Sequence, residues 1–165
     1  MIQRKICMVG TFAVGKTSLV SRFVRQIFSD RYMTTIGVRI DKKMVEVDDE
    51  QVKLLIWDIH ADDSFQAFRP SYLRGASGVI LVIDGTRRQT LADAELLFQR
   101  TRDHIGPVPF AVALNKHDLV GQWDVPAEAE AVWRERAEIV QRTSARTGLG
   151  VEAIFSGLSR VLVER

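Results

Sequence analysis

The stretch Gly10-Thr11-Phe12-Ala13-Val14-Gly15-Lys16-Thr17 stands between an aliphatic run and a pattern with helical spacing. The run before it, residues 2–9, predicts a strand. Residues 16–26 have the apolar spacing of an amphipathic helix, with one face made of Leu19, Val20, Phe23, Val24 and Ile27. The stretch therefore predicts a strand, a glycine-bounded turn and a helix in immediate succession.

This turn matches the pattern G-x-x-x-x-G-K-T in the strand, loop and helix context that the pattern requires. Backbone N–H groups of such a loop point inward and can cradle phosphate oxygens. Lys16 would add a compact positive charge at the β and γ phosphates, and Thr17 would offer a hydroxyl to Mg²⁺. A glycine-rich turn without a ligand is the alternative, but the complete motif in this context favours phosphate binding.

Further aliphatic runs at 52–56, 79–83, 110–114 and 139–140 predict additional strands. Their continuity, without polar alternation, is typical of strands buried on both faces of a mainly parallel sheet. Helical patterns over residues 91–104, 127–136 and 151–163 lie between or after them. Strands that alternate with helices predict a doubly wound α/β sandwich.

Residues 38–57 interrupt that alternation, because two strand-like stretches are joined by an acidic turn at 48–50 with no room for a helix. An antiparallel hairpin fits best there. The mixed stretches 28–37 and 59–74 are expected to be loops beside the functional site.

Composition limits the classes of protein that the chain can belong to. Its 165 residues suffice for one domain, expected over 1–165, and 46% hydrophobic residues exclude general disorder. The formal net charge of +2 is spread along the chain, so nucleic-acid binding has no support. The single cysteine, Cys7, cannot form an internal disulfide, which favours a reducing, cytoplasmic location. The sequence has no membrane-length apolar run, signal pattern or lipidation cysteine, so we expect no direct membrane anchor.

A second motif, Asn115-Lys116-His117-Asp118, follows the strand predicted at 110–114. The Asp118 carboxylate can accept hydrogen bonds from N1–H and the exocyclic amine of guanine, a donor pair that adenine lacks. Lys116 would lay its aliphatic stem over the purine face. Alone, the motif is equally compatible with a polar turn; with the phosphate loop about a hundred residues upstream it indicates a guanine nucleotide.

Over essentially its whole length the chain resembles small GTPases of the Ras superfamily, most closely the Rab-like branch. The resemblance adds four segments to the two motifs: residues 34–38 (switch I), 55–58 and 71–76 (the two ends of switch II) and 143–146 (the last base-binding loop). It implies GTP and GDP as ligands with Mg²⁺. It also implies an α/β P-loop NTPase G domain: a six-stranded, mostly parallel sheet with one antiparallel edge strand, flanked by five helices.

The resemblance also assigns site residues. Thr35 would coordinate Mg²⁺ when the γ-phosphate is present, Asp58 would hold the ion through water, and Phe28 would pack edge-on against guanine. The implied nucleotide-binding set is Thr11, Phe12, Ala13, Val14, Gly15, Lys16, Thr17, Ser18, Phe28, Thr35, Asn115, Lys116, Asp118, Ser144, Ala145 and Arg146. The metal set is Thr17, Thr35 and Asp58, and the catalytic set is Lys16, Thr35, His60, Ala61 and Asp62.

Switch II departs from the family pattern D-x-x-G-Q, because this chain has Asp58-Ile59-His60-Ala61-Asp62. Ala61 keeps a backbone N–H for the γ-phosphate, but its Cβ disfavours a positive φ and restricts the hinge. Asp62 is shorter than glutamine, lacks the amide donor and brings negative charge toward an anionic phosphate. We therefore expect slow hydrolysis by the usual route.

Several other residues near this site have more than one interpretation. His60 would orient or deprotonate water, although a packed loop histidine is the simpler reading. Phe12 stands where the family usually has a small residue and would crowd an inserted arginine. Arg31 and Arg39 are candidate cationic groups from within the chain, with plain surface solvation as the alternative.

Three functions are compatible with these motifs. The first is a GTP and GDP switch that presents switch I and switch II to effector, exchange-factor and activating proteins. The second is a hydrolysis-deficient, GTP-bound scaffold, and the third is a P-loop kinase or ATPase, which Asn115-Lys116-His117-Asp118 argues against. Trp57, Phe65 and Tyr72 stand where Rab-like proteins have an aromatic effector-facing cluster, or they simply cover the sheet.

Overall fold

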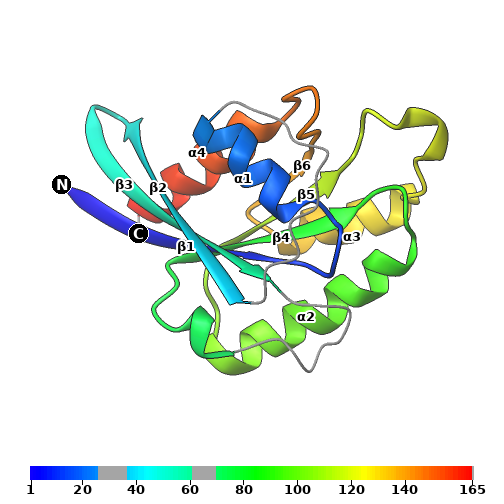
Figure 1. Ribbon diagram of the computed structural model, residues 1–165. Helices are drawn as coiled ribbons and strands as arrows, with labels where there is room; N and C mark the ends of the chain where they lie inside the picture. The colour runs from blue at the N-terminus through cyan, green and yellow to red at the C-terminus, as the bar shows by residue number, and fades with distance from the viewer. Residues whose placement is uncertain (26–36, 61–69, 165) are drawn as a thin grey trace.

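In the computed structural model, residues 1–25, 37–60 and 70–164 are described, and they form one six-stranded sheet flanked by helices (Figure 1). The strand order is β2-β3-β1-β4-β5-β6. Only β2 and β3 pair antiparallel, and the other neighbours pair parallel. The strands are β1 (Ile2–Val9), β2 (Gly37–Val47), β3 (Glu50–His60), β4 (Gly78–Asp84), β5 (Phe110–Asn115) and β6 (Ile139–Arg142).

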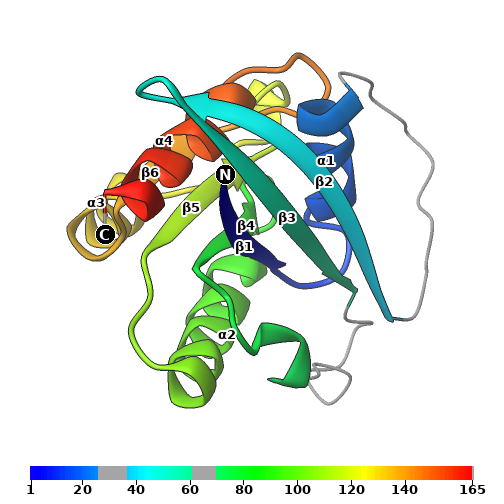
Figure 2. The same ribbon diagram turned by 90° about the vertical axis from the view of Figure 1, so that its left-hand side faces the viewer.

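Helices cover both faces of the sheet, as Figure 2 shows from the side. The described residues contain four α-helices: α1 (Lys16–Arg25), α2 (Gln89–Ile105), α3 (Ala127–Arg136) and α4 (Val151–Val163). Short 3-10 turns occupy Pro70–Leu73 and Val120–Gln122. Helices α1 and α4 pack on one face and α2 and α3 on the other. None of the helices in these residues has the length and apolar character needed to cross a bilayer.

Two hydrophobic clusters, one on each face, hold the layers together. On one face the rings of Phe23 and Phe155 stack with centroids 4.1 Å apart. On the other, Phe98 and Phe110 pack edge-on against Trp133. Every residue of β4 and β5 is buried, which explains why these strands are continuous apolar runs in the sequence.

The hairpin predicted within residues 38–57 is confirmed as β2 and β3. Val47 pairs with Glu50, so Asp48 and Asp49 alone form the turn. Both have positive φ angles, 47° and 67°, and aspartate tolerates this left-handed region better than most residues. The acidic pair at 48–49 is therefore a turn signal as well as a solvated charge.

The predicted fold class is confirmed, with one correction. The described residues hold four α-helices and short 3-10 turns, and they do not test the fifth helix that the resemblance implies. The stretch 59–74 was expected to be a loop from its first residue, but β3 continues to His60, which pairs with Gly37. Backbone pairing with β2 carries the strand past the point where the apolar pattern ends.

Candidate functional site

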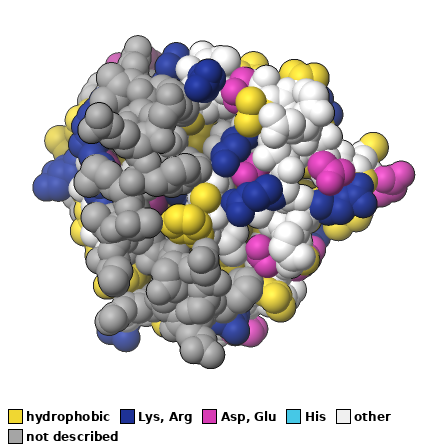
Figure 3. Space-filling view, turned by 45° about the vertical axis from the view of Figure 1, so that its right-hand side comes forward, with side chains coloured by type: hydrophobic (Ala, Val, Ile, Leu, Met, Phe, Trp, Pro, Cys, Tyr) yellow, Lys and Arg dark blue, Asp and Glu magenta, His cyan; other side chains and the backbone are white. Residues whose placement is uncertain are grey.

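The motifs of the sequence meet at the carboxyl edge of the sheet. The loop 10–15 follows β1, Asp58 lies near the end of β3, and Asn115 ends β5. Ligands of open α/β sheets bind at this edge, because the loops leaving the parallel strands converge there. In Figure 3, several Lys and Arg side chains lie beside the residues that are not described, with Asp and Glu side chains among them.

The loop between β1 and α1 depends on glycine at two positions. Gly15 has a φ of 103°, and a Cβ there would stand 2.3 Å from Asn115 Nδ2. A Cβ on Gly10 would meet the Val82 carbonyl oxygen at 2.8 Å. Ala13 also has a positive φ, 65°, which costs an alanine about 1 kcal/mol and needs support from its surroundings.

Lys16 is buried beneath this loop, with 6% of its surface exposed. Its ammonium donates to the carbonyl oxygens of Gly10 at 2.9 Å and Thr11 at 3.3 Å. Burial lowers the pKa of Lys16 to about 8, because desolvation outweighs the opposing attraction of Asp58. Anionic phosphate oxygens bound beside this ammonium would therefore raise its pKa again and favour its charged form.

Thr17 and Asp58 place two oxygens side by side next to that ammonium. Thr17 Oγ1 donates a hydrogen bond of 2.6 Å to Asp58 Oδ2, and Asp58 is fully buried. A hydroxyl and a carboxylate are the hard oxygen donors that Mg²⁺ prefers, and this ion is usually held by few protein ligands together with phosphates. The donor set thus fits Mg²⁺, although the described part of the chain has no cluster of three His, Cys, Asp or Glu side chains that could hold a metal ion by itself.

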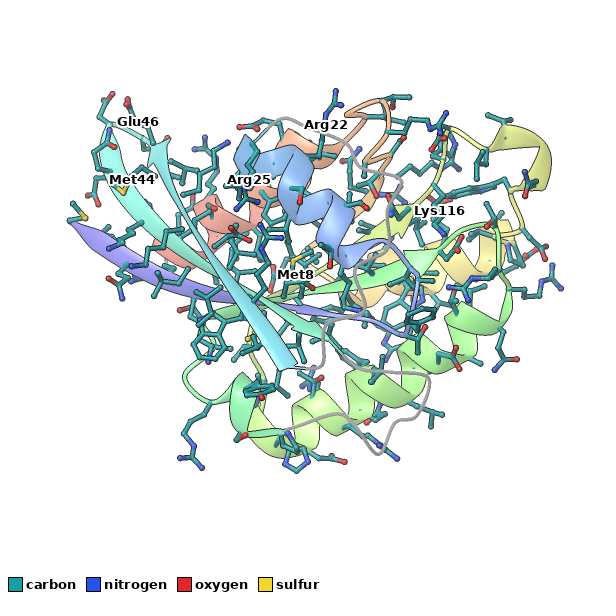
Figure 4. The ribbon with its side chains drawn as sticks, viewed as in Figure 1. Met8, Arg22, Arg25, Met44, Glu46 and Lys116 are labelled. Carbon is teal, nitrogen blue, oxygen red and sulfur yellow. The ribbon has the colours of Figure 1, made fainter. Side chains whose placement is uncertain are left out.

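Asn115 and Lys116 tie the second motif to the phosphate loop. Asn115 Nδ2 donates to the Val14 carbonyl oxygen at 2.9 Å and its Oδ1 accepts from Thr143 Oγ1 at 3.0 Å. Lys116 Nζ donates to the Ala13 carbonyl oxygen at 2.9 Å. In Figure 4 the labelled Lys116 lies beside the start of α1, consistent with this contact.

Asp118 is oriented by the last loop of the site. Ser144 Oγ donates to Asp118 Oδ1 at 2.8 Å, and Ser144 Oγ itself accepts from the Thr147 N–H at 3.1 Å. Ala145 is nearly buried next to Ser144. The carboxylate is therefore fixed through one oxygen.

The structure brings most of the predicted nucleotide-binding residues together. The phosphate loop and first turn of α1 contribute Thr11, Phe12, Ala13, Val14, Gly15, Lys16, Thr17 and Ser18. The base-side loops contribute Asn115, Lys116, Asp118, Ser144, Ala145 and Arg146, of which the first four make the contacts above.

Other predicted residues fall outside the described part of the chain. These are Phe28, Arg31, Thr35, Ala61, Asp62 and Phe65. His60 ends β3, and its side chain is not among those described. Their assigned roles stay predictions.

Four further candidate residues are placed by the structure. Phe12 is 36% exposed at the loop surface. Arg39 pairs with Asp41 at 3.2 Å, and Arg25 pairs with the same carboxylate at 2.9 Å. Trp57 and Tyr72 lie with ring centroids 6.5 Å apart.

Sequence reasoning missed Asp84, which ends β4 and is 1% exposed. Its carboxylate pairs with Lys116 and Arg87, each at 2.9 Å. Burial alone would raise the pKa of Asp84, but hydrogen bonds from Thr86, Lys116 and Arg87 outweigh it and lower that pKa. An acidic residue closing a fully apolar strand at the carboxyl edge is the signal that could have identified it.

Arg22 was missed as well. From α1 its guanidinium donates to the carbonyl oxygens of Arg146 and Thr147, both at 3.2 Å (Figure 4). It therefore joins the helix that follows the phosphate loop to the loop that orients Asp118.

Comparison with protein families gives a match that covers nearly the whole chain. The model of the Ras family matches residues 5–164. The matched range includes the phosphate loop, the Asn115-Lys116-His117-Asp118 motif and the loop that contains Ser144.

Proposed function

The chain belongs to the Ras family of GTP-binding switch proteins, and from this premise we propose a slow, Mg²⁺-dependent GTP and GDP switch of the Rab-like type. The proposed unit is a single G domain over residues 1–165. Membership of this family leaves the P-loop kinase or ATPase alternative without support.

The observation that carries the proposal is the hydrogen-bonded chain from the phosphate loop to the base loops. Lys116 and Asn115 both donate hydrogen bonds to carbonyl oxygens of the phosphate loop. Two residues after Lys116, Asp118 accepts a hydrogen bond from Ser144 of the last loop. A guanine nucleotide has anionic phosphates at one end and an N–H donor pair at the other. The buried cation and the fixed carboxylate complement these two ends.

The residues have distinct proposed roles. The N–H groups of residues 13–17 bind phosphate oxygens, and Lys16 neutralises charge on the β and γ phosphates. Mg²⁺, when bound, would neutralise further phosphate charge, and Thr17 and Asp58 would hold it together with Thr35. Asp118 selects guanine, with the Ala145 N–H toward its carbonyl oxygen and Phe28 against its edge.

Hydrolysis is attack of water on the γ-phosphate, which releases GDP and inorganic phosphate. In this chain Asp62 stands where the family has glutamine, so water is poorly oriented and the anionic side chain repels the phosphate. Ala61 restricts the same hinge, and His60 is the remaining candidate to orient water. We therefore propose that turnover is slow without a partner.

Ras-family GTPases generally work with exchange factors, activating proteins and effectors. For this chain we propose that switch I, residues 28–38, and switch II, residues 58–72, form the shared contact surface. Trp57 precedes switch II and Tyr72 ends it, and their rings lie with centroids 6.5 Å apart. Phe12, exposed on the phosphate loop, would hinder a partner that inserts an arginine there.

A second candidate function is a GTP-held scaffold that does not hydrolyse. Asp62, Ala61 and Phe12 together favour this function, since each departs from the family pattern at a position expected to lie near the reacting γ-phosphate. A single turnover separates the two candidates. The protein is loaded with GTP and Mg²⁺, free nucleotide is removed, and bound GTP and GDP are followed by chromatography over hours.

Accumulation of GDP supports the switch, and persistence of GTP supports the scaffold. Competition of excess ATP against bound labelled GDP is the control for base choice. Efficient displacement by ATP would contradict the guanine assignment in either case.

A further inference from the structure

We propose that Arg87 is a positioning residue that holds the phosphate loop in its nucleotide-binding conformation from the outside. The inference rests on the proposed function, because it concerns binding of the nucleotide at this loop. The inference goes beyond the proposed function because it assigns a role to a residue that belongs to neither nucleotide motif.

Arg87 lies in the turn between β4 and α2 and links that turn to the phosphate loop. Its Nε contacts Asp84 Oδ2 at 2.9 Å, and its Nη2 donates to the Phe12 carbonyl oxygen at 2.8 Å. The side chain is 45% exposed, whereas Asp84 is buried, so one end of the contact is anchored in the core. The planar guanidinium can serve both acceptors at once.

The backbone under Arg87 is fixed as well. Its N–H donates to the Asp84 carbonyl oxygen at 3.1 Å, and its own carbonyl oxygen accepts from Thr90 Oγ1 at 2.7 Å. Thr90 is buried at the start of α2. The guanidinium is therefore presented by a rigid turn.

Lys116 makes the matching contact on the next residue of the loop. Its Nζ bonds to the Ala13 carbonyl oxygen and to Asp84 Oδ2, both at 2.9 Å. Two cations that share one carboxylate oxygen thus hold two consecutive carbonyl groups of the loop. The Asp84 carboxylate is itself held by the backbone N–H and hydroxyl of Thr86, at 2.9 and 2.6 Å.

Holding these carbonyls outward sets the direction of the N–H groups. The Phe12 carbonyl and the Ala13 N–H belong to one planar trans peptide, so they point in opposite directions. The same holds for the Ala13 carbonyl and the Val14 N–H. Because Ala13 adopts a left-handed φ of 65°, this part of the loop needs external contacts to keep its N–H groups turned toward phosphate.

The test is the release rate of a fluorescent GDP analogue from R87A, compared with wild type and R88A. Arg88 is a matched control, because it is the adjacent arginine but pairs with Asp124 at 3.1 Å, away from the phosphate loop. We expect R87A to release the analogue about tenfold faster, since a hydrogen bond to a charged group is lost. R88A should stay within about twofold of wild type, and R87K should recover part of the loss.

Thermal melting with and without GDP separates positioning from a general structural role. We expect R87A and R88A to melt alike without nucleotide, while GDP raises the melting temperature of R87A less than that of R88A. Equal release rates for R87A and R88A would overturn this inference and leave the proposed function standing. An R87A protein that melts well below R88A without nucleotide would do the same. A wild type that binds no GDP would overturn the proposed function, and this inference with it.

Discussion

Thr17 and Asp58 are 41 positions apart in the chain, yet Thr17 Oγ1 donates a hydrogen bond of 2.6 Å to Asp58 Oδ2. Parallel pairing of β1 with β3 produces this contact, because it sets Met8 beside Asp58 at the edge where the phosphate loop begins. The hydroxyl at the start of α1 then reaches the carboxylate on β3. In the nucleotide-bound protein these two oxygens are the proposed Mg²⁺ side of the site.

Removing the carboxylate charge should uncouple nucleotide release from Mg²⁺. In wild type, we expect a chelator to speed GDP release strongly, because bound Mg²⁺ would neutralise phosphate charge and would be held by Thr17 and Asp58. In D58N, release with Mg²⁺ present should be at least about tenfold faster, and the chelator should add little. The measurement is fluorescent GDP release with and without the chelator.

The control for D58N is D103N, which removes an exposed carboxylate on α2 and should behave as wild type. An unchanged effect of the chelator in D58N would contradict the proposed role of Asp58.

Asp118 should decide which base is bound. In D118N the amide still accepts from Ser144, so the loop contact of 2.8 Å can persist. The variant loses the charged acceptor for the guanine donor pair, and GDP affinity should fall at least about tenfold. Xanthine carries a carbonyl where guanine carries the amine, so the new amide N–H₂ should favour xanthosine diphosphate.

Calorimetric titration of D118N with both nucleotides measures this exchange. D124N is its control, since Asp124 is a nearby half-exposed carboxylate that pairs with Arg88. Retention of GDP preference by D118N would remove the basis for the base assignment.

The motifs were predictable because their residue types are fixed by ligand chemistry. Lys16, Thr17 and Asp118 each carry a group that a phosphate, a metal ion or a guanine requires, and the structure sets them at one sheet edge. The order of apolar runs likewise predicted the doubly wound sheet, since strands buried on both faces are near-continuous apolar runs, here up to the polar residues Asp84 and Asn115 at their ends.

The residues that support the motifs were not predictable in the same way. Arg22, Asp84 and Arg87 act by holding backbone carbonyls or other side chains, and any residue whose position in the fold allows it can do this. The roles of Arg22 and Arg87 follow from tertiary placement and leave no spacing in the sequence, and for Asp84 the one signal is its place at the end of an apolar strand. The end of β3 at His60 is similar, because it is set by backbone pairing with Gly37.

Nucleotide binding should take up protons near neutral pH through Lys16. Burial lowers the pKa of this group to about 8 in the free protein, and anionic phosphates favour its charged form and raise that pKa again. With a pKa of about 8 the free group is partly deprotonated near pH 8, so binding should take up a fraction of a proton there and less at pH 7. By the same linkage, affinity should decrease as pH rises through 8.

Calorimetric titration with GDP and Mg²⁺ in two buffers of different ionisation enthalpy gives this proton count. Uptake that does not change between pH 7 and pH 8 would contradict the depressed pKa of Lys16.

Restoring glutamine in switch II should speed the chemistry. If Asp62 slows hydrolysis because it is short, lacks the amide donor and is anionic, then D62Q should raise the single-turnover rate by about tenfold or more. GDP release should change little, because the residue is proposed to act on the γ-phosphate and GDP has none. D63Q is the matched control, since it removes a negative charge at the next position without placing an amide at residue 62. Equal acceleration in D62Q and D63Q would show that general charge, and not orientation of water, limits the reaction. No acceleration in either variant would contradict the role of Asp62 and leave Ala61 and His60 as the residues to test.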